Sequence, residues 1–173
     1  MKDKLKILIT VSVLIAMEII LGRFFSFHTP IVRIGLGFVP IAICAMLYGP
    51  IWAGAAAALS DILGMMLFPI GPYFPGFTLS AALSGIVFGL FLHKREGTNA
   101  RIAGAVAINC LLISLLLSTY WLTILTGTPF LGILPTRIVQ NIIMIPVQFV
   151  VLKLLQKPME IFTKRWVVVR SGS

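Results

Sequence analysis

The sequence predicts an all-α, polytopic membrane protein in which six transmembrane helices form a compact bundle with a ligand cavity open to the outside. Of the 173 residues, 59% are hydrophobic and 11% are charged, and the mean hydropathy is +1.06. Soluble domains average about 45–50% apolar and about 25% charged residues. At about 20 residues per spanning helix, the chain has room for about five or six spans and little else. Residues 1–173 are therefore expected to form a single membrane domain without a soluble catalytic part.

Six apolar segments define the expected helices. They cover about residues 5–22, 36–48, 51–68, 77–93, 102–125 and 136–156, before a C-terminal cytoplasmic tail at 157–173. The first follows a basic start but has no small-residue cleavage site, so we expect a retained helix rather than a signal peptide. The second is short for a complete span and is expected to be tilted or to begin irregularly. Gly49 and Pro50 mark the start of the third, because proline is well tolerated in a first helical turn.

The connections between these segments set the other boundaries and differ on the two sides of the predicted bundle. The inner connections are brief, at 48–50 and at the charged turn 94–101. The outer connections are rich in glycine, proline and aromatic residues, at 23–37, 69–76 and 126–135. Such segments are typical either of a lid over a cavity or of ordinary external turns with interfacial aromatics, and both interpretations stay open.

The formal net charge of +9 is distributed unevenly between the two sides. With the amino terminus inside, the outer side keeps only Arg23, Arg33 and Arg137. The inner side collects Lys2, Lys4, Lys6, Lys94, Arg95, Arg101, Lys153, Lys157, Lys164, Arg165 and Arg170. This bias predicts that both termini are cytoplasmic. It makes contact with anionic lipid a secondary consequence, and nucleic acid binding is not needed to explain the charge.

Asp61 is a lone carboxylate in the middle of the apolar stretch 51–68. A charge at that depth is unfavourable, and such residues usually face the bundle interior, a substrate or an ion. Asp61 is therefore the first candidate for a ligand contact. Glu18, in the outer third of the first helix, is a candidate either for pairing with an outer arginine such as Arg23 or for a ligand contact.

The last apolar segment carries a polar stripe. Its members, spaced three and four residues apart on one helical face, are Arg137, Gln140, Asn141, Met144 and Gln148. The opposite face is aliphatic. A buried polar stripe is expected either of a binding wall or of a structural amide network between helices.

Aromatic residues gather near the outer mouth. Trp121, with Ser118 and Ser114 one and two turns earlier, forms a face of the fifth helix and is also placed where membrane-belt tryptophans occur. The remaining rings that a flat ligand could contact are Phe24, Phe25, Phe27, Tyr73, Phe74 and Phe77.

The sequence contains no recognisable pattern for several kinds of functional site. His28 and His93 are single and far apart, so a metal site is not expected. Cys44 and Cys110 lie in apolar segments and are expected to be buried thiols. No catalytic arrangement is recognisable, and the P-loop pattern is absent, so neither enzymatic activity nor ATP hydrolysis by this chain is expected. The remaining features suit a ligand with an anionic tail for the arginines and a flat, hydrogen-bond-donating head for Asp61.

Four segments resemble a known family. LYGPIWAGAAAALSDILG, at 47–64, is similar to the helix 2–3 signature of the S components, the substrate-binding subunits of energy-coupling factor (ECF) vitamin transporters. Within that group, VRIGLGFVPI (32–41), YFPGFTLSAALSG (73–85) and LTGTPFLGILPTRIVQNIIMIPVQ (125–148) resemble the folate-specific member. Together these segments extend over most of the chain.

The resemblance implies a multi-pass subunit of a bacterial cell membrane that captures folate or a related pterin from outside. Its partners would be a transmembrane coupling subunit and two cytoplasmic ATPases that use the ATP, and no cofactor is expected in this chain. Ser12 and Ala16 match the small-residue motif of the first helix that contacts the coupling subunit. The candidate folate contacts are Asp61, Arg33, Arg137, Trp121, Gln140, Asn141, Phe77 and Tyr73.

Other functions also fit the pattern of residues. The chain could be an S component for another vitamin, or a stand-alone proton-coupled carrier in which Asp61 or Glu18 relays the proton. A purely structural membrane subunit is the remaining alternative.

Overall fold

The computed structural model describes residues 2–28, 33–69, 73–93 and 99–171. Nearly all of them are helical, as the sequence predicts. The order of elements is α1 (Lys2–Phe24), β1 (Ser26–His28), β2 (Arg33–Gly35), α2 (Phe38–Tyr48), α3 (Pro50–Leu67), α4 (Pro75–Leu92), α5 (Asn99–Ala107), the π-helix η1 (Ile108–Leu117), α6 (Ser118–Thr126) and α7 (Phe130–Ser171).

Within the described residues, five helical segments are long and apolar enough to cross a membrane. They are Lys4–Phe24, Pro50–Leu67, Pro75–Leu92, Asn99–Thr126 and Phe130–Met159. The second expected segment, 36–48, forms α2, which has 11 residues and is too short for a complete span, as its sequence length suggested. The all-α membrane fold is therefore confirmed, with α2 as a short helix inside the bundle.

The structure differs from the expected boundaries in three places. Residues 26–28 and 33–35 form a small antiparallel hairpin where an irregular loop was expected. The fifth helix contains η1 in its middle. The last helix begins at Phe130 rather than 136 and continues to Ser171, through what was expected to be a tail.

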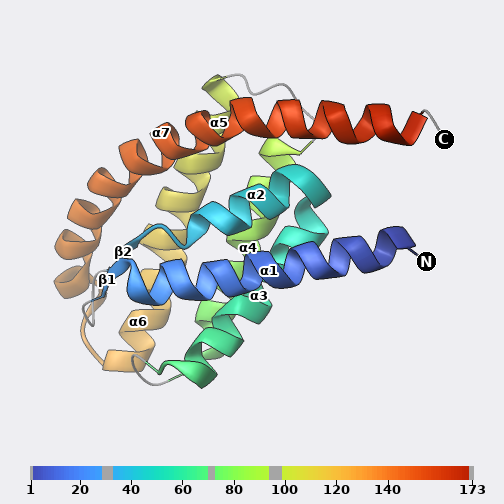
Figure 1. Cartoon of the computed structure of the whole chain (residues 1–173). Helices are drawn as coiled ribbons and strands as arrows, with labels where there is room; N and C mark the ends of the chain where they lie inside the picture. Colours follow the sequence, from blue (N-terminus) through green and yellow to red (C-terminus); the bar gives the residue numbers. More distant parts are fainter. Residues whose placement is uncertain (1, 29–32, 70–72, 94–98, 172–173) are drawn as a thin grey trace.

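The two chain termini lie at one end of the molecule, and the hairpin and α6 lie at the other (Figure 1). α7 curves around the bundle in the same view and contains Pro135, Pro146 and Pro158. Proline removes an intrahelical hydrogen bond and bends a helix, so these residues account for the curvature. The curve carries the first half of α7 along the side of the bundle, where its inward face becomes one wall of the cavity described below.

The closest helix packing joins α3 and α4. Gly85 lies against the backbone of Ala53, and Gly89 lies against Pro50, with no room for a β-carbon at either glycine. Small residues at such contacts let two membrane helices approach closely and gain van der Waals contact. This packing fixes α4 beside the first turns of α3, the helix that carries Asp61 two to three turns further on.

The turn between α2 and α3 is held by a residue at the end of α4. Gly49 has φ of 93°, a left-handed conformation that favours glycine, and the His93 ring packs directly on it. His93 Nδ1 is also 3.2 Å from the carbonyl oxygen of Met46. Cys44 and Cys110 are buried free thiols, as expected.

Candidate ligand-binding cavity

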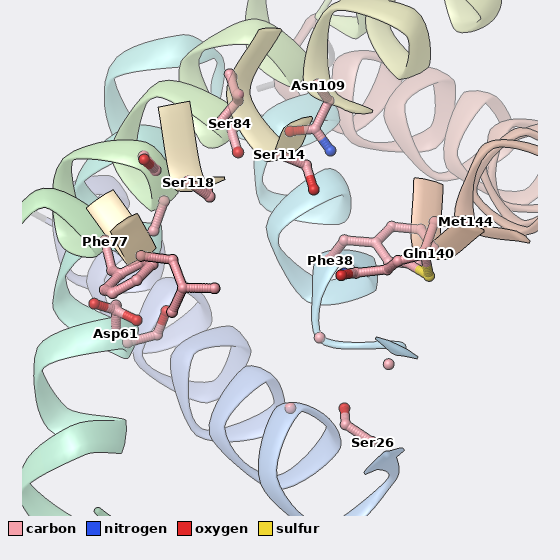
Figure 2. Close-up of a pocket in the computed structure, with 18 of the residues that line it drawn as sticks. Ser26, Phe38, Asp61, Phe77, Ser84, Asn109, Ser114, Ser118, Gln140 and Met144 are labelled. Carbon is pink, nitrogen blue, oxygen red and sulfur yellow. The ribbon is translucent and has the colours of Figure 1, made fainter. Parts of the chain in front are cut away.

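A cavity of about 650 Å³ lies among the helices and reaches the hairpin. Its lining includes Glu18 and Arg23 of α1, Ser26 and Gly35 of the hairpin, Phe38 of α2, and residues of α3, α4, η1, α6 and α7. Figure 2 shows Asp61 and Phe77 on one side of this space and Gln140 and Met144 on the other, with Ser84, Asn109 and Ser114 toward one end. The volume falls within the range of about 300–1,000 Å³ that small-molecule sites occupy.

Asp61 lies on α3, is partly buried and lines the cavity. Thr78 of α4 donates a hydrogen bond from Oγ1 to Asp61 Oδ2 over 2.8 Å. The Tyr73 hydroxyl lies 3.1 Å from the same Thr78 Oγ1. The carboxylate is thus held from the α4 side and faces the cavity. Tyr73 and Phe77, both predicted ligand contacts, also line it.

The predicted polar stripe of α7 forms the opposite wall. Arg137, Gln140, Asn141 and Gln148 are all buried, with 3–7% of their surfaces exposed, and all line the cavity. Arg137 Nη1 donates to Gln140 Oε1 over 3.1 Å, and Asn141 Nδ2 donates to the Arg137 carbonyl oxygen over 2.8 Å. The first bond orients a buried guanidinium beside the cavity, and the second ties the Asn141 side chain to the backbone of α7.

The same stripe also takes part in an amide network between helices, the other interpretation that the sequence left open. Asn109 Nδ2 of η1 donates to Gln148 Oε1 over 3.2 Å, and Cys110 Sγ lies 3.5 Å from the same oxygen. Gln148 therefore joins α7 to η1, whereas Arg137 and Gln140 bond to each other within α7. The structural network therefore describes the Gln148 end of the stripe, and a binding wall remains the prediction for the Arg137 end.

The π-helix η1 brings to the cavity Asn109, which the sequence analysis did not select, together with Ser114, which it grouped with Trp121. Its hydrogen bonds join residues five apart, so Asn109 and Ser114 lie one turn apart on the cavity side, and Ser118 of α6 continues that line. π-helical turns often occur at functional sites. The available signal was Asn109, an amide in an otherwise apolar run.

Ser80 of α4 was also missed. It is 4% exposed and lines the cavity, and its hydroxyl makes no hydrogen bond within the described part of the chain. Buried hydroxyls normally have a partner, so Ser80 can supply a hydrogen bond to a bound molecule.

Trp121 does not line the cavity. Its ring packs against Gly76 and against Phe74, with ring centroids 5.6 Å apart, and Phe74 does line the cavity. The structure thus places Trp121 behind the aromatic wall. Its contact with a ligand remains a prediction.

Two other arginines that the sequence predicts on the outer side occupy different places. Arg23 lines the cavity and packs on Gly64 of α3, and Glu18 lines the cavity beside Gly22 and Gly37. The backbone of Arg33 lies opposite His28 in the register of the hairpin. Its side chain is outside the part of the chain that the structure describes, and so is its predicted ligand contact.

Ser12 and Ala16, the predicted docking residues, lie on an exposed face of α1. Ser12 Oγ donates to the Leu8 carbonyl oxygen over 2.8 Å, so its hydroxyl is satisfied within the helix. This face lies outside the cavity lining. No group of three or more potential metal ligands occurs within residues that the structure describes.

Comparisons with known proteins agree on one relationship. The family model "ECF transporter, substrate-specific component" matches residues 6–156. A protein of Clostridium novyi (strain NT) named folate transporter FolT is 43% identical over 149 residues, which is 86% of this chain and 87% of that protein. A folate transporter FolT of Leuconostoc mesenteroides is 29% identical over 146 residues, covering 81% of this chain and 78% of that protein. A crystal structure of FolT bound with folic acid superposes with a TM-score of 0.82 at 35% identity, covering 86% of this chain and 90% of that chain.

Proposed function

The chain belongs to the family of ECF transporter substrate-specific components, and we propose that it is the membrane-embedded subunit that binds folate for uptake. The main observation behind this proposal is the cavity, which has the Asp61 carboxylate of α3 in one wall and the buried Arg137 guanidinium of α7 in the opposite wall. The relatives named folate transporter and the FolT structure with folic acid support the choice of ligand.

The chemistry of folate fits the two walls. Its pterin head is flat and presents amino and ring N–H groups, which can donate hydrogen bonds to a carboxylate such as Asp61. The pterin ring can also pack on Phe77 or Phe74. Its glutamate tail carries carboxylates, which a guanidinium binds bidentately. We assign the tail to Arg137 and to Arg33. Gln140 orients the Arg137 guanidinium, and both Gln140 and Asn141 can add hydrogen bonds of their own.

The energy for uptake would come from other subunits. The sequence lacks a P-loop, so we propose that two ATPases and a transmembrane coupling subunit complete the importer. The exposed α1 face with Ser12 and Ala16 is the proposed contact with the coupling subunit, because small residues allow close helix approach. Both termini would be cytoplasmic, which opens the cavity toward the outside.

Ligand binding to the purified chain tests this function. Detergent-solubilised protein is expected to bind folate without ATP, and mass spectrometry of co-purifying small molecules should identify a folate. A competition panel of pterins, thiamin, riboflavin and biotin separates folate from other vitamins. Uptake by the chain alone into vesicles under a pH gradient would instead indicate a proton-coupled carrier, and absence of tight folate binding would refute the proposal.

A further inference from the structure

Three side chains form a hydrogen-bonded line that ends on the cavity carboxylate. Thr78 Oγ1 lies 2.8 Å from Asp61 Oδ2 and 3.1 Å from Tyr73 Oη. A threonine hydroxyl has one proton and two acceptor lone pairs, whereas an ionised carboxylate only accepts. The Thr78 proton must therefore point to Asp61, and Tyr73 must be the donor to Thr78. The line has one direction, from Tyr73 through Thr78 to Asp61.

This line fixes the orientation of Asp61. A threonine hydroxyl on a helix has an alternative partner, the carbonyl oxygen three or four residues earlier. In this structure it instead bonds across from α4 to α3, over 17 positions of sequence, while Tyr73 occupies its acceptor side. One acceptor position of Asp61 Oδ2 is thereby used, and the other positions of the carboxylate remain for a ligand.

The position of Tyr73 extends this constraint to the edge of the cavity. Tyr73 lines the cavity but is 49% exposed, and it lies just before α4 begins at Pro75. The sequence suggested only its ring as a ligand contact. The bonding pattern gives its hydroxyl a second role.

We propose that Thr78 is a positioning residue that aligns the Asp61 carboxylate for the ligand, and that Tyr73 acts on the ligand through Thr78. The inference rests on the proposed function, since it concerns the same cavity and the same ligand. It adds Thr78, which does not line the cavity, to the residues that set affinity.

Two substitutions of Thr78 separate its hydroxyl from its shape. Thr78→Val keeps the branched shape and removes the hydroxyl, and Thr78→Ser keeps the hydroxyl and removes the methyl group. Folate affinity, measured by calorimetry on protein in detergent, should fall about three- to tenfold in Thr78→Val and stay within about twofold of wild type in Thr78→Ser. A role in packing alone predicts the opposite order. Thr123→Val is the matched control, because Thr123 Oγ1 bonds to the Thr119 carbonyl oxygen within α6.

A double-mutant cycle tests the direction of the line. Tyr73→Phe should weaken folate binding about two- to threefold in the wild-type background and have no further effect when combined with Thr78→Val. Additive effects would show that Tyr73 acts directly, and wild-type affinity in Thr78→Val would overturn the proposal. If Thr78→Val does not fold, Thr78→Ser should still bind folate within about twofold of wild type, and Tyr73→Phe should have no further effect when combined with Asp61→Asn. Additive effects in that second cycle would again show that Tyr73 acts directly. Failure of the wild-type protein to bind folate would refute the proposed function, and this inference with it, whereas normal wild-type binding with an unaffected Thr78→Val refutes this inference alone.

Discussion

Arg137 and Gln140 are hydrogen-bonded one turn apart on α7, with Arg137 Nη1 3.1 Å from Gln140 Oε1. Both are buried, so the guanidinium is held in place on the cavity wall before any ligand arrives. A pre-oriented guanidinium binds a carboxylate with less loss of side-chain freedom than a flexible lysine does.

We therefore expect Arg137→Lys to weaken folate binding about tenfold and Arg137→Ala about ten- to a hundredfold, since a hydrogen bond to a charged group contributes about 1.5–3 kcal/mol. Gln140→Ala should cause a smaller loss of the same kind. Calorimetric titration measures all three. Lys153→Ala, which changes an exposed charge of α7, is the control and should bind like wild type. Unchanged affinity in Arg137→Ala would contradict the assignment of the ligand tail.

The role of Asp61 can be tested by changing the ligand and the protein together. Asp61→Ala should lower folate affinity about ten- to a hundredfold. A folate analogue without the 2-amino group should bind wild type more weakly than folate does, but should bind Asp61→Ala no more weakly than folate does. Isothermal titration of the four pairs gives the interaction energy between the carboxylate and the amino group. If the two losses were additive, Asp61 would not contact this edge of the pterin.

The helices and the α7 wall follow from regular patterns in the sequence, whereas the irregular parts of the site do not. Arg137, Gln140 and Gln148 repeat at α-helical spacing, and the structure brings them to one face as predicted. The hairpin was not predicted because strands of three residues, 26–28 and 33–35, are too short to show alternation.

The fifth helix shows a different limit. An α-helical period grouped Trp121 with Ser114 and Ser118, but the wider turns of η1 bring Asn109 onto the face of Ser114, which an α-helical period does not predict. The two serines reach the cavity together with Asn109, and Trp121 packs behind Phe74. Nothing in the local sequence marks the change to π-helical hydrogen bonding, which depends on the packing of neighbouring helices.

The close contact between Gly89 and Pro50 should make the stability of the protein sensitive to any side chain at position 89. A β-carbon at Gly89 would overlap the Pro50 backbone, which cannot move aside as a flexible side chain can. We expect Gly89→Ala to destabilise the protein by about 1–3 kcal/mol, seen as a lower unfolding temperature in detergent. Gly132→Ala is the matched control, because its β-carbon would lie an ordinary 3.5 Å from Thr128 Cγ2, and alanine favours a helix by up to about 1 kcal/mol. Equal unfolding temperatures for the two variants would argue against the described α3–α4 packing.

The two native cysteines report on the cavity without any substitution. Both are buried, with Cys44 0% and Cys110 1% exposed, but only Cys110 lines the cavity. A small methanethiosulfonate reagent should therefore modify Cys110 faster than Cys44, and folate should slow the modification of Cys110 alone. Quantifying the two modified peptides by mass spectrometry uses Cys44 as the internal control for unfolding.

A membrane-impermeant reagent applied from outside to intact cells should give the same order if the cavity opens outward. Modification of Cys110 that is indifferent to folate would place the ligand elsewhere, because a molecule filling a cavity of about 650 Å³ must restrict access to a thiol in its wall.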